Sequence, residues 1–192
     1  YAGTGFANPH AATAVNGTTY TYDNSGNLLS AGTWKYLWDY RNRLAQATST
    51  SATTTFGYDY SGQRVFSQTA SSTTVFPSKY FSVTSRTIAS TTFATTTSYI
   101  WSGDTLVAYI EQPQINGVAT GTPQTYYVHP DHLGSTNVIT NASGTVVTSK
   151  DYYPYGSTRI ESGDASLTRG YIGQFETDNL LYLQARYMDP AR

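Results

Sequence analysis

The sequence has no cysteine, a single methionine and few charged residues. Without cysteine, disulfides and thiolate metal ligands are excluded. Charged residues make up 12% of the chain, against about 25% in ordinary soluble domains. The formal net charge is -1, so the chain lacks the basic excess of proteins that bind nucleic acid. No apolar run approaches the roughly 18 residues of a membrane span. We therefore expect neither a nucleic-acid partner nor a membrane span.

Chemical motifs are also scarce. We find no phosphate-binding glycine loop, no nucleophile elbow and no metal-binding helix motif. The sequence therefore predicts no cofactor, no resident metal and a protein that is not an enzyme. His129, Asp131 and His132 stand close together, but zinc sites need three or four ligands. We expect these three side chains to make structural hydrogen bonds.

Aromatic and hydroxyl side chains are abundant instead. Tyrosine occurs 18 times, and aromatic residues make up 15% of the chain. Threonine and tyrosine favour strands, while 16 glycines and 7 prolines supply the turns between them. This composition predicts an all-β protein.

A short unit recurs in the first third of the chain, at residues 20–28, 36–44 and 56–65. It reads aromatic, any residue, aromatic, Asp, two residues, then Gly or Asn. The two aromatics share one face of a strand because side chains alternate. The Asp is expected to bond backbone amides of a turn, and Gly or Asn tolerates the positive φ there. The predicted structural residues are Tyr22, Asp23, Gly26, Trp38, Asp39, Asn42, Tyr58, Asp59 and Gly62.

Further elements follow from local patterns. Residues 71–76, 95–101 and 105–110 are predicted strands, and residues 102–104 a turn. Residues 112–123 carry two prolines and two glycines and are predicted as a loop at a long hairpin tip. A short helical turn is predicted over residues 178–186.

Specific motifs begin at residue 126. Residues 131–135 read Asp-His-Leu-Gly-Ser, residues 151–156 read Asp-Tyr-Tyr-Pro-Tyr-Gly, and residues 180–190 read Leu-Leu-Tyr-Leu-Gln-Ala-Arg-Tyr-Met-Asp-Pro. With the upstream Tyr-Asp units, this series resembles the Rhs and YD-repeat proteins and their repeat-associated core. The structural residues carried by these motifs are Asp131, His132, Leu133, Gly134, Arg186, Tyr187, Asp189 and Pro190.

The resemblance implies a curved or spiral antiparallel β-sheet built from YD-repeat hairpins, part of a cocoon-like shell. It implies a YD-repeat region over residues 1–125 and a core segment over residues 126–192, continuous with the same sheet. It also implies a secreted or cell-surface structural protein. The expected partners are the remainder of a longer chain, since neither end resembles a natural terminus, and an enclosed C-terminal effector. Identical copies paired edge to edge are a further expectation, because few charges protect the strand edges.

Two alternatives stay open at this point. In several relatives the core is an aspartyl autoprotease, and Glu176 or Asp178 is the candidate remnant of its first acid. The motif around them is shortened, and the second acid's motif is incomplete after Asp189. Because such catalysis needs two carboxylates close together, we expect no proteolysis. The other alternative is a carbohydrate-binding surface module that uses Trp34, Trp38 and Trp101, although aromatic pairs also stabilise sheets.

Overall fold

The computed structural model describes residues 10–163, 167–177, 180–184 and 186–190. These residues form antiparallel strands with short turns and one 3-10 turn. The all-β antiparallel prediction is confirmed. The chain divides into two compact units, residues 1–70 and 71–192. The boundary predicted at residue 125 rests on sequence motifs and stays a prediction.

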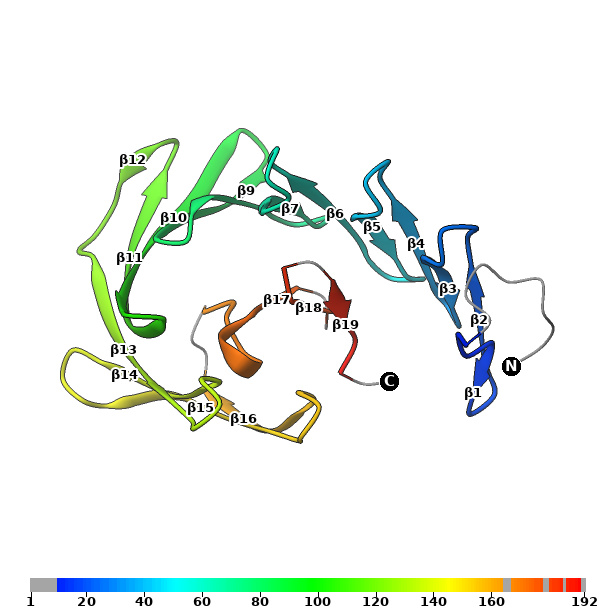
Figure 1. The fold of residues 1–192 in the computed structure, drawn as a ribbon. Helices are drawn as coiled ribbons and strands as arrows, with labels where there is room; N and C mark the ends of the chain where they lie inside the picture. The colour runs from blue at the N-terminus through cyan, green and yellow to red at the C-terminus, as the bar shows by residue number, and fades with distance from the viewer. Residues whose placement is uncertain (1–9, 164–166, 178–179, 185, 191–192) are drawn as a thin grey trace. The chain divides into compact units, whose positions relative to one another are not determined.

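The first unit is a meander in which each strand pairs with the next along the chain (Figure 1). Side chains alternate between the two faces. In β6, for example, Thr54 and Phe56 are buried while Thr55 between them is less so, because a strand presents successive side chains to opposite faces. The strands are β1 (Ala14–Val15), β2 (Thr18–Tyr22), β3 (Leu28–Ala31), β4 (Trp34–Trp38), β5 (Leu44–Thr48), β6 (Thr53–Tyr58) and β7 (Arg64–Gln68).

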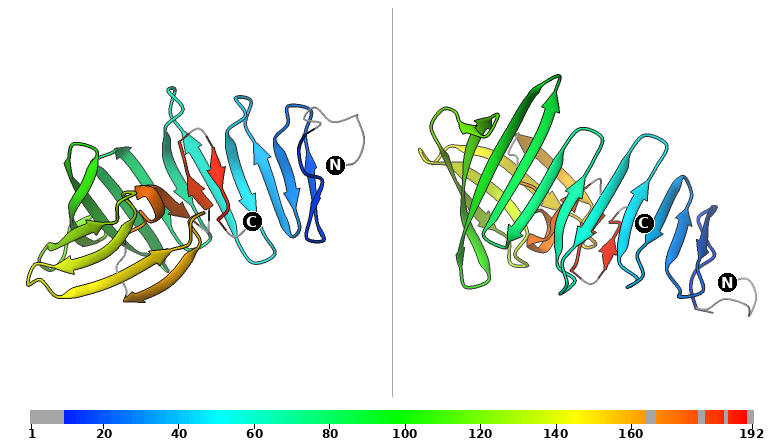
Figure 2. Two further views of the ribbon diagram at one scale, coloured as in Figure 1. Left: turned by 60° about the horizontal axis from the view of Figure 1, so that its bottom comes forward. Right: turned by 90° about the horizontal axis from the view of Figure 1, so that it is seen from above.

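The second unit contains a curved sheet and a small three-stranded sheet on its concave side (Figures 1 and 2). The curved sheet runs β8 (Thr73–Ser78), β9 (Phe81–Ile88), β10 (Thr91–Ser102), β11 (Thr105–Ile115), β13 (Gln124–Pro130), β14 (Thr136–Asn141), β15 (Val146–Tyr152) and β16 (Thr158–Gly163), with β12 (Val118–Ala119) paired to β11. The small sheet holds β17 (Phe175–Thr177), β18 (Leu180–Tyr182) and β19 (Tyr187–Met188), preceded by the 3-10 turn Tyr171–Gly173.

The core of the second unit lies between the curved sheet and residues 167–175. Tyr99, Tyr109 and Ile139 are buried together with Leu167, while Trp101 packs at the margin. Leu167 comes from the segment that covers the sheet, so this segment completes the apolar core. Burial of this apolar area is what holds the segment on the sheet.

Two local predictions are wrong. Residues 180–182 form strand β18 and not a helical turn, because Leu180 and Leu181 are buried in pairing with neighbouring strands. The loop predicted from residue 112 begins later. Strand β11 continues through Pro113, which lies opposite Thr95 of β10, and ends at Ile115. In both places tertiary pairing overrides local propensity.

Candidate functional site: the repeated turn and the docked core segment

The same turn geometry recurs along the chain, and Asp23 shows it first. The Gly26 amide donates to the Asp23 carbonyl at 3.1 Å, and the Asp23 amide donates to the Asn27 carbonyl at 2.9 Å. The Asp23 carboxylate accepts from the backbone amides of Ser25 and Asn27, each at 2.8 Å. Gly26 has φ 84°. The hydrogen bond from the Asn27 side chain, followed by those from the backbone, holds the pKa of Asp23 below its ordinary value.

Asp39 and Asp59 each begin a turn of the same geometry. Each carboxylate accepts from the amides two and four residues further on, at 2.8 to 2.9 Å. Asn42 takes the positive-φ position of the second turn, at 58°, where Gly62 stands in the third. Asparagine tolerates this conformation because its short polar side chain bonds locally.

The Asp-His-Leu-Gly-Ser motif is a further copy of this turn. The Asp131 amide donates to the Ser135 carbonyl, and the Gly134 amide donates to the Asp131 carbonyl. The Asp131 carboxylate accepts from the amides of Leu133 and Ser135, each at 2.8 Å. Sequence reasoning treated this motif as separate from the repeat. The signal was available, because Asp131 and Gly134 have the same spacing as Asp23 and Gly26.

Two more turns extend the series. Asn141 replaces aspartate and accepts from the amides of Ser143 and Thr145 through its side-chain oxygen. The Tyr153 turn keeps the backbone bonds, with the Gly156 amide donating to the Tyr153 carbonyl at 2.8 Å. The repeated turn therefore continues through residues 131–157, which the sequence patterns had assigned to separate motifs.

The second aromatic of each repeat donates to a backbone carbonyl that precedes that repeat. The Trp38 indole N–H donates to the Leu28 carbonyl at 2.7 Å, and the Tyr58 hydroxyl donates to the Leu44 carbonyl at 2.7 Å. Leu28 and Leu44 each begin the strand after the preceding turn. The Tyr22 hydroxyl likewise donates to the Ala12 carbonyl. The aromatic therefore fixes the spacing of successive hairpins.

Neighbouring turns also contact each other. The Arg43 guanidinium binds the Asp39 carboxylate at 2.7 Å and donates to the Asp59 carbonyl at 3.1 Å. It also lies 4.7 Å from the centre of the Tyr58 ring, a cation–π distance. Arg41 donates to the Tyr60 carbonyl at 2.9 Å. The Asp39 turn thus supports the Asp59 turn at one end of the strands.

Residues 167–175 dock on the Asp131 turn. The Thr136 amide donates to the Gly170 carbonyl at 3.0 Å, and the Ile172 amide donates to the Ser135 hydroxyl at 3.1 Å. Ser135 is fully buried. Ile172 has φ 47° and ψ 31°, which is strained for a β-branched residue. Such strain persists where surrounding bonds hold the conformation, as they do here.

Arg169 secures the same segment to the curved sheet. Its guanidinium lies 3.8 Å from the centre of the Phe175 ring and 5.0 Å from that of Trp101. It donates to the Gly173 carbonyl at 2.9 Å. The residue is only 8% exposed, so its cation–π contacts are largely desolvated, where they are strongest.

Two acidic residues of the autoprotease alternative, Glu176 and Asp189, lie among the described residues. Glu176 is in β17, and burial raises the pKa of its carboxyl while nearby Lys150 opposes that rise. Lys150 itself binds Glu161 at 2.6 Å. Asp178, the other candidate, lies outside the described residues. Asp189 follows β19, one residue before Pro190.

Arg186 and Tyr187, which belong to the last sequence motif, make contacts at strands β18 and β19. The Leu183 amide donates to the Arg186 carbonyl at 2.8 Å, and the Tyr187 ring lies 5.2 Å from that of Tyr182. In the part of the chain that the structure describes, no group of three or more ligand side chains is arranged to hold a metal ion. His129 Nε2 lies 3.0 Å from the Thr140 hydroxyl oxygen, and His132 is exposed.

The three tryptophans have contacts within the chain. Trp34 stacks on Tyr36 with 6.3 Å between ring centres, Trp38 bonds the Leu28 carbonyl, and Trp101 lies beneath Arg169. The most exposed aromatics are instead Tyr40 and Tyr60, at 86% and 90%. No helix among the described residues has the length and apolar character to cross a membrane.

Comparison with known proteins gives one family match and a consistent set of neighbours. The Teneurin YD-shell family model matches residues 9–190. The tRNA nuclease WapA of Bacillus subtilis (strain 168) is 28% identical over 201 residues, which cover 93% of this chain and 8% of that protein. The tRNA(Glu)-specific nuclease WapA of Bacillus subtilis subsp. natto (strain BEST195) gives the same identity and coverage.

Two solved structures share the fold. The crystal structure of TcdB2-TccC3 aligns with a TM-score of 0.75 and 16% identity, over 88% of this chain and 9% of that one. The crystal structure of TcdB2-TccC3-Cdc42 aligns with a TM-score of 0.73 and 18% identity over the same shares. The chain therefore spans less than a tenth of the length of each of these two relatives and two solved structures.

Proposed function

This chain belongs to the Teneurin YD-shell family, and from that we propose that it is a wall segment of a shell around an enclosed polypeptide. The observation that carries the proposal is the repeated turn at Asp23, Asp39, Asp59, Asp131 and Asn141. Each copy positions a hairpin against the next, and hairpins that are marginal alone become stable in a row. Such an array extends a sheet without needing a catalytic centre.

The role in enclosure is tested in the full-length gene product that carries this chain. The protein is incubated with a broad-specificity protease, and surviving peptides are identified by mass spectrometry. We expect the peptides of an enclosed segment to survive in the native protein and to be digested after unfolding in urea. If all segments other than the wall were digested as fast in the native protein as in the protein unfolded in urea, the proposal would be contradicted.

We further propose that the chain itself has no catalytic activity. Glu176 is the described candidate acid, and its raised pKa favours the neutral form. Aspartyl proteolysis needs a second carboxyl that shares its proton. Incubation of the 192-residue chain between pH 4 and pH 8 is expected to leave its mass unchanged. A cleavage product lost in a Glu176→Gln variant would overturn this.

Location and partners complete the proposal. The chain works in a secreted or cell-surface protein, and its first partner is the rest of its own longer chain. The outer strand β16 is exposed along its length, so it is also the edge through which identical copies pair. Light scattering at rising concentration is expected to show growing assemblies. The variant Ile160→Pro, within β16, should suppress these assemblies. Assemblies that grow equally in this variant would show that β16 is not the pairing edge.

A further inference from the structure

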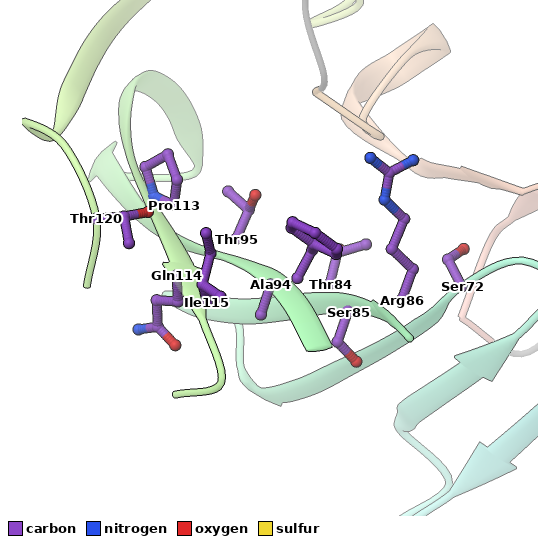
Figure 3. Close-up of a pocket in the computed structure, with 11 residues that line it drawn as sticks. Ser72, Thr84, Ser85, Arg86, Ala94, Thr95, Pro113, Gln114, Ile115 and Thr120 are labelled. Atoms are coloured by element: carbon purple, nitrogen blue, oxygen red, sulfur yellow. The ribbon is translucent and has the colours of Figure 1, made fainter. Parts of the chain in front are cut away.

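The second unit has a groove lined by residues of β9, β10 and β11. It lies beside the apolar core that Leu167 completes. Its volume is about 410 Å³, within the range of ligand-binding clefts. Phe93, Pro113 and Ile115 supply apolar surface, while Thr84, Thr95 and Arg86 supply polar groups. Figure 3 shows Pro113 and Thr95 on one side of the groove and Arg86 on the other.

The register places this groove on the concave face. Phe93 lies on the same side of β10 as Tyr99, because six residues separate them in a regular strand. Arg86 and Ile115 lie directly opposite Phe93 on the two neighbouring strands. Tyr99 belongs to the cluster that Leu167 covers. The groove is therefore a continuation of the surface on which residues 167–175 lie.

The groove is shaped by bonds within the chain. The Gln112 side chain donates to the carbonyls of Pro113 and Thr120, each at 2.9 Å, and the Thr120 amide donates to the Pro113 carbonyl at 2.8 Å. The Asn116 side-chain oxygen accepts from the Thr92 amide at 2.8 Å. These bonds hold the β11–β12 hairpin against β10 on one side of the groove, so a ligand meets a preformed surface there.

Arg86 gives the groove its charge. The residue is exposed, and its guanidinium lies 5.8 Å from the centre of the Phe93 ring. Within the described ranges, no carboxylate lies within 4.0 Å of it, whereas Arg43, Lys150 and Arg159 each have one. A cation held over an apolar ring favours a ligand that joins an apolar side chain to a carboxylate.

We propose that this groove binds an extended stretch of the enclosed polypeptide, with an apolar side chain between Phe93 and Ile115 and an adjacent acidic side chain on Arg86. The inference rests on the proposed function, since an enclosed chain would face this surface. The same face already holds residues 167–175 of this chain, with Leu167 in the core and Phe175 4.5 Å from Phe76 between ring centres. The groove offers the next apolar position along that surface.

The test uses the 192-residue chain and two fluorescein-labelled heptapeptides, Gly-Glu-Leu-Phe-Glu-Leu-Gly and its counterpart with both glutamates replaced by lysine. Fluorescence anisotropy measures binding. We expect the acidic peptide to bind roughly three- to tenfold more tightly, the range of a partly exposed ion pair with apolar support. Arg86→Glu should reverse the preference. Thr95→Phe, which fills the groove, should weaken binding of both peptides.

Two controls make the result specific. Lys35→Glu changes an exposed cation on a strand outside the groove and should leave the preference unchanged. A photoreactive benzoyl-phenylalanine in place of the peptide's phenylalanine should cross-link to residues of β9, β10 or β11. Equal binding of both peptides, or insensitivity to both Arg86→Glu and Thr95→Phe, would refute the groove. If the full-length protein still protects an enclosed segment in that case, the groove inference fails and the shell proposal stands.

Discussion

Asp131 is the residue on which the turn and the docked segment both depend. Asp131→Ala removes the acceptor for the Leu133 and Ser135 amides and is expected to lower the free energy of unfolding by about 1 to 3 kcal/mol. Asp131→Asn should cost much less, since Asn141 makes the equivalent bonds in its own turn. Urea unfolding followed by tyrosine fluorescence measures both variants. Equal losses for alanine and asparagine would show that the amide bonds are not the cause.

Glu176 has the opposite relation to pH from the turn aspartates. Burial raises the pKa of its carboxyl, so the protonated form stabilises the fold. That stability is fully present below the unfolded-state pKa, about 4.3, and is lost as the pH rises through the higher folded-state value. Glu176→Gln should therefore match the native chain at low pH and be more stable at pH 7.

The measurement is the urea midpoint of both proteins between about pH 4 and pH 7. Asp104→Asn, which makes the same acid-to-amide change at an exposed turn between β10 and β11, is the matched control. A constant difference between Glu176→Gln and the native chain across the range would contradict the assignment.

The turn aspartates have lowered pKa values, so their effect on stability changes with pH in the opposite direction to that of Glu176. Bonds from the Asn27 side chain and from backbone amides lower the pKa of Asp23, and the Ser61 side chain and backbone amides lower that of Asp59. A lowered pKa contributes stability above the unfolded-state value that is lost as the pH falls through the folded-state value. Acid should therefore weaken the repeated turns, while protonation of Glu176 removes the cost of burying its charged carboxylate.

At the scale of elements, the hydroxyl of Tyr58 links one hairpin to the one before it. Tyr58→Phe removes the bond to the Leu44 carbonyl and should reduce the stability of the first unit by about 0.5 to 1.5 kcal/mol. Tyr60→Phe makes the same chemical change two residues away, at a side chain that is 90% exposed, and should have almost no effect. Hydrogen exchange of the Leu44 to Thr48 amides should accelerate only in Tyr58→Phe.

The repeat could be predicted from sequence where its causes are local. Period-two aromatics and the Asp to Gly spacing lie within a few residues of each other, so strands and turns at residues 20–65 were foreseeable. The helical turn predicted over residues 178–186 was wrong because Leu181 is buried by strands β17 and β19. Strand pairing also carried β11 through Pro113, against the proline signal.

The docking of residues 167–175 on the sheet could not be predicted from local sequence patterns. The Ile172 amide meets the Ser135 hydroxyl across 37 residues of sequence, and Arg169 meets Trp101 across a longer interval. No periodicity or spacing encodes such contacts. Only the fold makes clear that Ser135, the last residue of the Asp131 turn motif, is the contact point for the strained turn at Ile172.

At the scale of the whole molecule, the repeated turn gives the chain a way to extend without enlarging its core. In the first unit, Trp38 and Tyr58 bond one hairpin to the one before it, so stability is expected to grow with the number of hairpins, as in other repeat proteins. A wall of this kind can enclose a polypeptide while using few charged residues.

The most direct test of the wall assignment is electron cryomicroscopy of the full-length gene product. We expect the hairpins of residues 18–68 and 73–163 to be resolved in the wall of a hollow shell, with the face of Tyr99 and Tyr109 turned toward the interior. The same strands closed into a solid domain outside any shell, or the Tyr99 face turned toward solvent, would contradict the account.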